Sequence, residues 1–473
     1  MRRDSVPGSD GVRRGVLALA AGEATTRLLG FALSAVIARR AGLDALAALT
    51  VAQGLIAYAL VAGDAGLSTD AVRRLAAGDG SRSHLIALTT AAQICLTAAA
   101  TTVLLIVVAV LPLTTASKQP VLALSLLPLS YALNLGYVLQ SSSRFKALTI
   151  SRITGQVAGV VLGVACLVRF DSFLLAVASI VLGAFVTDLL IAVASRQDWM
   201  PVRQVTVRAV LVRIKQGRGF LGYTMANHAS SSSPLLVIAI IGTAPDVAHY
   251  SVAQRILLLA MAPAQILAAV LLPRISLRGH VLDDEYWSQV LSVSVVAAGA
   301  ASALFVFARP ISEALFGPAA ASAAPVVRLV AIFLPVGYTS LLLTTTLLSR
   351  GRASMQAAIT AGSLLPLLVL AATFIRSSGA EGPLYAVLLT EVLVIVAVSR
   401  ALRVPPACLV RLALVLVVLF GAVAASVHGV GTLTNSLGIL ALVWLATAAP
   451  AVVLGLRAFG GRPLAALTVS SRR

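Results

Sequence analysis

The stretch GVLALAAGEATTRLLGFALSAVI, from Gly15 to Ile37, decides the fold class because it is long and apolar enough to cross a bilayer as a helix. It nevertheless carries Glu23 and Arg27 near its middle. Residues four apart lie on the same face of a helix, so both charges share a stripe that Gly30 and Ser34 continue. Because charge at membrane depth is costly, it usually faces a bundle interior or a water-filled path. We therefore expect this helix to line a polar site, unless the two charges only neutralise each other within a packed bundle.

The composition of the whole chain indicates a polytopic membrane protein. Of 473 residues, 59% are hydrophobic and 11% are charged, and no soluble domain of this size tolerates that balance on its surface. The net charge of +19 is spread over short segments between apolar runs, which argues against nucleic acid as a partner. Cys95, Cys166 and Cys408 have no paired spacing, so neither a disulfide framework nor a metal site is indicated. No motif for a cofactor or for catalytic residues is present either.

Apolar runs of about 18 to 25 residues predict an all-α protein with fourteen transmembrane helices. Lysine and arginine provide an independent test, because cytoplasmic loops carry the excess of these residues. With both termini in the cytoplasm, most of the 36 basic residues fall in cytoplasmic segments, and only a few fall in external turns or within spans. The predicted spans are 15–38, 45–68, 86–111, 120–141, 152–168, 173–195, 219–242, 247–272, 288–308, 323–347, 354–375, 381–401, 408–427 and 435–457.

An ordered series of short matches indicates that the first half of the chain is repeated in the second. We therefore expect two parallel six-helix repeats, related by an axis along the membrane normal, plus a C-terminal helix pair. Val51-Ala52-Gln53 recurs as Val252-Ala253-Gln254, Leu127-Pro128 with Tyr131 as Leu334-Pro335 with Tyr338, Arg144-Phe145-Lys146-Ala147 as Arg350-Gly351-Arg352-Ala353, and Thr187-Asp188 as Thr390-Glu391.

The repeat predicts the domain organisation of the chain. Residues 15–200 and 219–403 should form an N-terminal and a C-terminal six-helix lobe. Residues 201–218, in which basic and apolar side chains alternate, should form an interfacial connector between the lobes. Residues 1–14 should be a basic cytoplasmic tail, and residues 404–473 should hold helices 13 and 14 and a second cytoplasmic tail.

Charged and polar residues within the spans are the candidates for a substrate site, which a duplicated transporter places near mid-membrane between its halves. Arg27 and Arg255 are the preferred anion-binding groups, because arginine is permanently charged and its planar fork matches phosphate oxygens. For Arg255, a structural salt bridge to Glu23 or Asp64 is the alternative. The other substrate-binding candidates are Glu23, Asp64, Asn227 and Gln254, and the candidates for ion coupling or for a structural role are Asp188, Glu391 and Arg328.

Several of these residues lie in motifs that resemble a known superfamily. The motifs are similar to those of Wzx-type polysaccharide flippases in the multidrug/oligosaccharidyl-lipid/polysaccharide exporter superfamily, to which lipid II flippases also belong. They are Thr26-Arg27-Leu28-Leu29-Gly30-Phe31-Ala32 with Ile37-Ala38-Arg39 and Gly42, then Gly63-Asp64-Ala65-Gly66-Leu67, Tyr250 with Ala253 and Arg255, Leu272-Pro273-Arg274-Ile275-Ser276, Leu315-Phe316-Gly317 and Ala324-Pro325-Val326.

The resemblance implies a V-shaped bundle of two lobes that exports lipid-linked saccharides by alternating access. It also implies that Arg27 and Arg255 match arginines of the cationic cavity in lipid II flippases. Leu33 and the pair Leu60 and Val61 stand where those flippases have further arginines, and Gln254 replaces an acid. These departures favour a different saccharide, linked to a polyprenyl pyrophosphate.

The sequence thus predicts a flippase that moves a polyprenyl-pyrophosphate-linked oligosaccharide or polysaccharide precursor from the inner to the outer leaflet of the cytoplasmic membrane. Its partners would be the lipid-linked saccharide, membrane lipids, and a coupling proton or sodium ion unless the membrane potential drives transport. The alternatives are a lipid II flippase of peptidoglycan synthesis and a cation-coupled small-molecule antiporter of the same superfamily. A polytopic glycosyltransferase or ligase is disfavoured, because the external connections are too short for a catalytic domain, so we do not expect an enzyme.

Overall fold

The computed structural model describes residues 9–77, 81–111, 115–196, 205–268 and 284–407, together with six positions between 409 and 417. Across these ranges the chain is helical and contains no strand, which confirms the all-α prediction. By length and hydropathy, eight helical stretches in the described ranges can cross a membrane, or nine if the bent pair Ser292–Val306 and Ala308–Phe316 forms one span. The protein is therefore a multi-pass membrane protein. The predicted fourteenth helix, and most of the thirteenth, lie outside the described residues.

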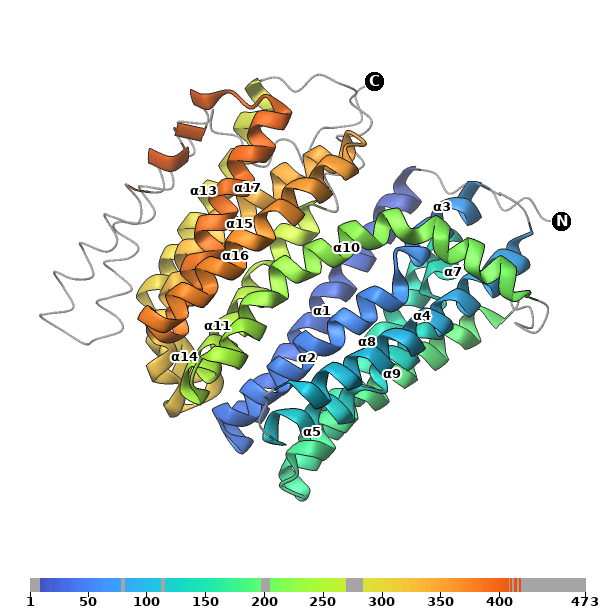
Figure 1. Ribbon diagram of the computed structural model, residues 1–473, viewed down its shortest axis with the longest axis horizontal. Coiled ribbons are helices and arrows are strands. Elements are labelled where there is room, and N and C mark those ends of the chain that lie inside the picture. The colour runs from blue at the N-terminus through green and yellow to red at the C-terminus, as the bar shows by residue number, and fades with distance from the viewer. Residues whose placement is uncertain are drawn as a thin grey trace, which may run out of the picture. The chain divides into compact units, whose positions relative to one another are not determined.

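The chain forms two compact units, Met1–Ile240 and Ile241–Arg473. The predicted boundaries of lobes, connector and tails remain predictions. The helices of the first unit are α1 (Ser9–Ala41), α2 (Leu43–Asp64), α3 (Leu67–Ala77), α4 (Arg82–Val110), α5 (Thr115–Leu124), α6 (Leu127–Ala132), α7 (Gly136–Ser141), α8 (Phe145–Arg169), α9 (Phe173–Ala194) and α10 (Val207–Ile241), as Figure 1 shows.

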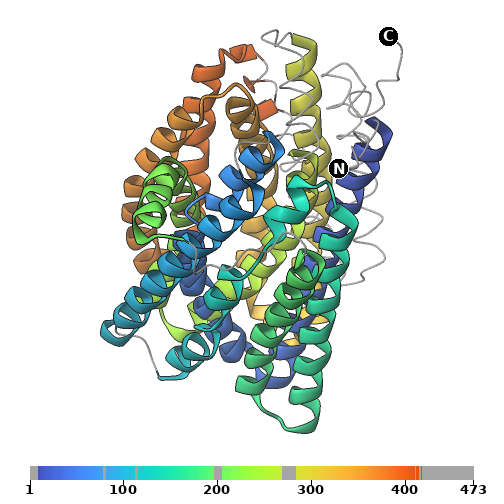
Figure 2. The ribbon, with the colours of Figure 1, turned by 90° about the vertical axis from the view of Figure 1, so that its right-hand side faces the viewer.

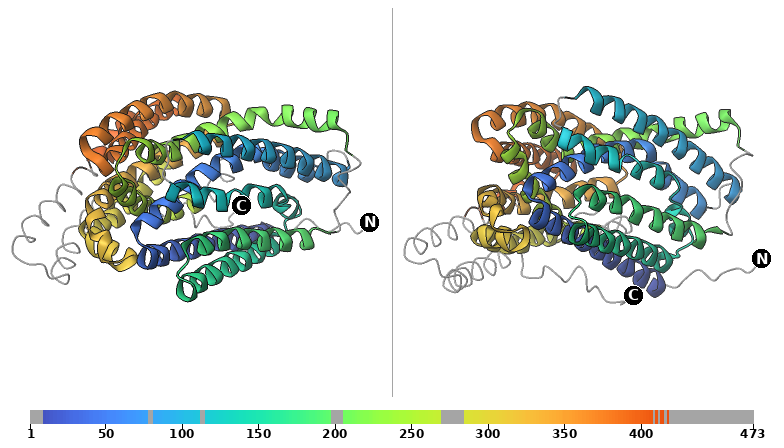
Figure 3. Two further views of the ribbon diagram at one scale, coloured as in Figure 1. Left: turned by 60° about the horizontal axis from the view of Figure 1, so that its bottom comes forward. Right: turned by 90° about the horizontal axis from the view of Figure 1, so that it is seen from below.

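Helices α8 and α9 pack closely because glycines remove side chains from their interface (Figure 2). Gly155, Gly159 and Gly163 recur every four residues along one face of α8 and are buried. A Cβ atom added to Gly159 would lie 3.0 Å from the carbonyl oxygen of Ser179 on α9, and one added to Gly183 would lie 2.9 Å from Cα of Gly159. Small residues at this spacing let membrane helices approach to backbone contact. Helix α1 packs against α8 in turn (Figure 3).

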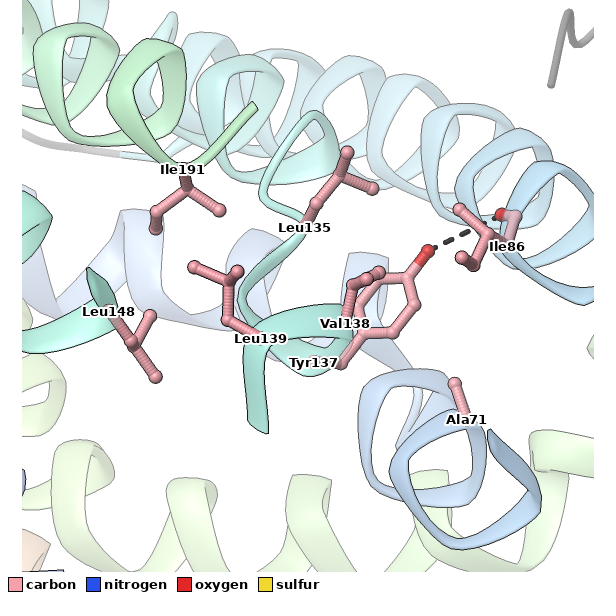
Figure 4. Close-up of a cluster of buried hydrophobic side chains, with 8 residues drawn as sticks. All are labelled: Ala71, Ile86, Leu135, Tyr137, Val138, Leu139, Leu148 and Ile191. Carbon is pink, nitrogen blue, oxygen red and sulfur yellow. Dashed lines mark hydrogen bonds between the residues drawn. The ribbon is translucent and has the colours of Figure 1, made fainter. Parts of the chain in front are cut away.

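A buried apolar cluster fills the first unit where α3, α4, α7, α8 and α9 meet. Tyr137 of α7 is 3% exposed, and its hydroxyl donates a hydrogen bond to the carbonyl oxygen of Ile86, 3.3 Å away (Figure 4). That bond supplies the partner that a buried phenol requires. The cluster holds the short helix α7 in place, next to the residues of the cavity described below. Its members are Ala71, Ile86, Leu135, Tyr137, Val138, Leu139, Leu148 and Ile191.

A second apolar cluster lies among the described helices of the second unit. Trp287 is 1% exposed and lies with Leu343, Leu347, Val394 and Val398 in this cluster. The helices are α11 (Ala244–Ala260), α13 (Asp284–Val306), α14 (Ala308–Phe316), the 3-10 turn η3 (Pro318–Ala323), α15 (Ala324–Ser349), α16 (Ala353–Ser378), the turn η4 (Gly379–Glu381) and α17 (Gly382–Leu402).

The internal repeat is visible in corresponding contacts within each unit. In the first, Nη1 of Arg144 donates to the carbonyl oxygen of Ala194, at the end of α9, over 2.9 Å. In the second, Nη1 of Arg352 donates to the carbonyl oxygen of Ala401, near the end of α17, over 2.9 Å. The residue before each arginine, Ser143 or Gly351, has positive φ. Arg352 is thus the counterpart of Arg144. The sequence match had paired Arg144 with Arg350, which is wrong by two residues.

Candidate functional site

A polar cavity of about 410 Å³ lies within the first unit. Helix α1 contributes Glu23, α8 contributes Arg152, and α9 contributes Asp188, so charged side chains from three helices face one space. Asn134, from the break between α6 and α7, adds an amide. The remaining lining residues are Thr26, Leu60, Leu127, Ser130, Tyr131, Gln156, Ile180, Gly183, Ala184 and Thr187.

Glu23 pairs with two arginines, of which Arg152 lines the cavity and Arg27 does not. Nε of Arg27 donates to Oε1 of Glu23 over 3.0 Å, one helical turn along α1, as the sequence predicted. Nη1 of Arg152 lies 3.6 Å from the other carboxylate oxygen, Oε2. All three side chains keep between 33% and 41% of their surface exposed. The carboxylate is therefore an accessible acceptor that a second anion can replace.

Asp188 forms a second polar contact in the same cavity. Its Oδ1 accepts a hydrogen bond from Nδ2 of Asn134 over 2.6 Å. The Oδ1 atom of Asn134 accepts in turn from the backbone N–H of Gly136 over 2.8 Å, which fixes the amide where α7 begins. The interruption of the helix between Ala132 and Gly136 is what turns this asparagine toward α9. Because the amide nitrogen donates to it, the carboxylate of Asp188 is held in one orientation.

Asp64 was predicted to bind substrate, but it does not line the cavity, and its hydrogen bonds join the end of α2 to the start of α3 and to α4. Its Oδ1 accepts from the hydroxyl of Ser68 over 2.5 Å and from Nε2 of Gln93 over 3.0 Å. Its Oδ2 accepts from the backbone N–H of Gly66 over 3.1 Å. Oxygen atoms at the start of a helix satisfy N–H groups that lack partners within the helix. In this structure Asp64 therefore caps α3 after the bend that follows α2.

Asn227 of α10 is exposed within the first unit and also lies outside the cavity lining. The neighbouring residue, His228, packs edge-on against Tyr58 of α2, with ring centroids 4.7 Å apart. His228 therefore holds this part of α10 against α2. The sequence predicted that Asn227 lies on this helix, but not which way its side chain faces.

The remaining predicted residues belong to the second unit. Gln254 and Arg255 are adjacent on α11, and Oε1 of Gln254 is buried without a hydrogen-bond partner among the described residues. Glu391 of α17 accepts a hydrogen bond from the hydroxyl of Ser340 of α15 over 2.5 Å. Arg328 is exposed, with its guanidinium 6.0 Å from the ring centre of Phe305. Ser340 thus gives Glu391 a partner from a neighbouring helix, as Asn134 does for Asp188 in the first unit.

Of the residues that line the cavity, only Glu23 and Asp188 were predicted site residues, and the two partners of these acids, Arg152 and Asn134, were not. The predicted span 152–168 puts Arg152 at the end of a helix, whereas α8 begins at Phe145 and carries Arg152 two turns into the helix. The sequence does indicate a polar face here, because Arg152 and Gln156 are four residues apart. Both line the cavity in the structure. Asn134 gave no comparable signal, because nothing in the apolar run predicts where the helix is interrupted.

The fold matches solved transporters at low sequence identity. The lipid II flippase MurJ in an inward closed conformation has a TM-score of 0.74 at 12% identity, over 95% of this chain and 99% of that chain. A transporter of the MOP superfamily from Pyrococcus furiosus has a TM-score of 0.59 at 15% identity, over 83% and 94%. A multidrug resistance MATE transporter in an outward-facing conformation has a TM-score of 0.60 at 15% identity, over 83% and 94%. At these identities the likeness shows the fold.

No curated protein sequence matches the chain. The family model described as "Polysaccharide biosynthesis protein" matches residues 12–278, which is more than half of the sequence. The matched segment begins just before the apolar stretch that carries Glu23 and Arg27 and includes all residues of the polar cavity. The chain therefore belongs to the polysaccharide biosynthesis protein family and has the fold of the MOP superfamily transporters.

Proposed function

We propose that the protein is a flippase that moves a polyprenyl-pyrophosphate-linked oligosaccharide or polysaccharide precursor from the inner to the outer leaflet of the cytoplasmic membrane by alternating access. Membership of the polysaccharide biosynthesis family and the transporter fold support this function. The observation that carries it is the position of Glu23, whose carboxylate is shared by Arg27 and Arg152 at a cavity within the membrane-spanning unit.

The arrangement suits a pyrophosphate in three ways. Arginine stays protonated and offers a planar fork to phosphate oxygens. A cavity of about 410 Å³ has room for the diphosphate group. In the empty protein, Glu23 pairs with both Arg27 and Arg152, so that neither arginine lacks an anionic partner at membrane depth. When substrate arrives, its phosphates take the place of the carboxylate and recover part of the solvation lost on leaving the membrane surface.

The charge balance of this group supports coupling to a cation. Glu23 and Asp188 offset Arg27 and Arg152, so the group is formally neutral before substrate binds. A pyrophosphate would then bring excess negative charge into a region of low dielectric, where that excess is costly. Uptake of a proton or a sodium ion by the released carboxylates removes the excess. Asp188 is our proposed site of this uptake, with Glu391 and Arg328 as its candidate counterparts in the second unit.

The other predicted site residues, from both units, complete the proposal. Arg255 would bind anionic groups of the substrate, and Gln254, with its buried and unpaired oxygen, would accept a hydrogen bond from it. Asn227 would contact the saccharide, whereas Asp64 would act by shaping the start of α3. Both termini would lie in the cytoplasm, and the protein would act as a transporter without catalysing a covalent reaction.

Complementation tests the proposal directly. A strain lacking the gene would receive the parent, Arg27→Ala, Arg27→Lys or Arg152→Ala, and export of the glycan would be measured at matched membrane levels. We expect both alanine variants to lose export and lysine to restore part of it, because lysine keeps the charge but not the fork. Arg169→Ala is the matched control, since Arg169 is exposed at the end of the same helix as Arg152. Normal export by the alanine variants would show that the arginines are structural.

Transport of lipid II is the second candidate function, because the fold matches the lipid II flippase MurJ over nearly the full length of both chains. The two candidates differ in one test. Expression of this protein in cells depleted of their own lipid II flippase rescues growth only if lipid II is a substrate. We expect no rescue, since Leu33, Leu60 and Val61 stand where arginines of lipid II flippases are expected.

A further inference from the structure

A second, strongly basic cavity of about 390 Å³ lies in the first unit, beside the first turns of α10. It shares no lining residue with the cavity around Glu23. Three arginines line it, and none of the described lining residues is acidic. The lining residues are Arg74 of α3, Leu85 and Leu88 of α4, Thr206 just before α10, and Arg208, Ala209, Val212 and Arg213 of α10.

Among the described residues, the cations around this cavity outnumber the one carboxylate that pairs with them. Asp70 of α3 pairs with Arg73 at 3.1 Å, with Arg74 at 2.8 Å and with the buried Arg213. One carboxylate balances one unit of charge, and arginine does not lose its proton in proteins. Arg208 adds a further charge at the cavity wall. The group therefore carries a surplus of positive charge that a bound anion would neutralise.

The guanidinium of Arg213 also has one N–H group without an acceptor among the described residues. Its side chain is 1% exposed, with Nη1 paired to Asp70 and Nη2 donating to the carbonyl oxygen of Leu67 over 3.4 Å. Its buried Nε–H has no hydrogen-bond partner among the described residues. A buried charged donor without an acceptor is costly, and a phosphate oxygen is a strong acceptor for guanidinium. The cavity thus combines surplus charge with an unused donor.

Exposed apolar side chains lie on the same turns of α10 as Arg208 and Arg213, and one of them, Val212, lines the basic cavity. Val207 is 77% exposed, Leu211 is 62% exposed and Val212 is 51% exposed, all within the first two turns of α10. Arg208 and Val212 are one turn apart, so a cation and an apolar side chain stand together at the cavity wall. Segments that combine these two kinds of side chain bind where phosphate head groups meet acyl chains. A free phosphate ion would use the arginines but not the apolar residues.

We infer that this cavity binds the phosphate group of an anionic phospholipid, with Arg74, Arg208 and Arg213 around the phosphate and with Val207, Leu211 and Val212 against the acyl chains. The bound lipid would neutralise the surplus charge around Asp70. It would also fix the start of α10 to α3 and α4. The inference does not depend on which substrate the protein transports.

Native mass spectrometry of the full chain, purified in detergent and titrated with phosphatidylglycerol or phosphatidylcholine, tests this lipid site. We expect phosphatidylglycerol to bind more tightly than phosphatidylcholine. Arg208→Gln should lower the affinity for phosphatidylglycerol about fivefold, which is the contribution of one basic residue near a membrane surface. The double variant Arg74→Gln/Arg208→Gln should lose more. Lys215→Gln is the matched control: it removes the same charge from an exposed position of α10 that does not line the cavity, and should bind as the parent does.

Three results would overturn the inference. The first is equal affinity of the parent and Arg208→Gln for phosphatidylglycerol. The second is an equal loss in Lys215→Gln, which would indicate diffuse attraction by the charge of α10. The third is that millimolar inorganic phosphate displaces phosphatidylglycerol completely, which would make the site one for soluble phosphate. Arg208 is exposed, so its replacement should leave folding intact, and the melting temperature of each variant checks this.

Discussion

Nη1 of Arg152 lies 3.6 Å from Oε2 of Glu23, which joins α8 to α1 at the wall of the polar cavity. The same carboxylate accepts from Nε of Arg27 on its other oxygen. A single acid thus pairs with two arginines from two helices.

A double-mutant cycle with Glu23→Gln and Arg152→Gln should reveal a coupling of about 0.5–1 kcal/mol in the free energy of unfolding. The value is modest because both side chains are at least one-third exposed. Glu23→Gln alone should also slow glycan export, since two uncompensated arginines would hold the pyrophosphate too tightly. Thermal unfolding in detergent and an export assay measure the two effects. Additive effects of the two substitutions on stability would exclude a direct interaction.

Asp70→Asn should destabilise the protein by about 3–5 kcal/mol, because it leaves the buried Arg213 without its counter-ion. Arg213→Met should cost less, since Asp70 keeps Arg73 and Arg74 as partners. The melting temperatures of the two variants show which substitution destabilises the protein more. Asp44→Asn is the control, because Asp44 is an exposed acid in the first turn of α2. A larger loss for Arg213→Met than for Asp70→Asn would contradict this account of the charge cluster.

Gly183→Ala should separate α8 from α9 and destabilise the protein by about 1–3 kcal/mol. The added Cβ would lie 2.7 Å from the carbonyl oxygen of Gly155 and 2.9 Å from Cα of Gly159, and backbone atoms cannot move aside as a flexible side chain can. In Gly362→Ala on α16, the new methyl group meets no atom within 4 Å, so stability should stay the same or rise slightly. Thermal unfolding distinguishes the two. Equal stability of both variants would mean that the interface relaxes.

Arg144→Ala and Arg352→Ala should each cost about 1 kcal/mol, because each arginine donates to a carbonyl at the end of a helix. Similar losses are expected, since the two contacts correspond in the internal repeat. Lys146→Ala provides the control, as Lys146 is exposed in the first turn of α8. Melting temperatures again serve as the measurement. A loss confined to one of the two arginines would break the equivalence of the repeats at this turn.

Reporter fusions test the orientation of the chain. Fusions after Arg203 and after Arg403 should report cytoplasm, and a fusion near Asp246 should report the outside, because basic residues are concentrated in alternate loops. An external signal from either of the first two fusions would rule out the predicted alternation of spans.

Much of the fold follows from the sequence by itself, because hydropathy is a property of the chain before it folds. The described ends of most spans agree with the apolar runs: α9, predicted as 173–195, is observed as Phe173–Ala194, and α17, predicted as 381–401, as Gly382–Leu402. The ionic pair of Glu23 and Arg27 was also predictable, because both residues lie on one helix and spacing alone sets their distance.

Only the tertiary structure decided which polar residues meet across helices. The second partner of Glu23, Arg152, lies on another helix, and its approach to Glu23 depends on how α1 packs on α8. Asp64 and Asp188 are similar residues within apolar runs. Asp64 caps α3 because a bend follows α2. Asp188 lies within the continuous helix α9 and faces the cavity, where Asn134 donates to it. Hydropathy shows that a charge is buried, but only the packing of neighbouring helices fixes the partner that compensates it.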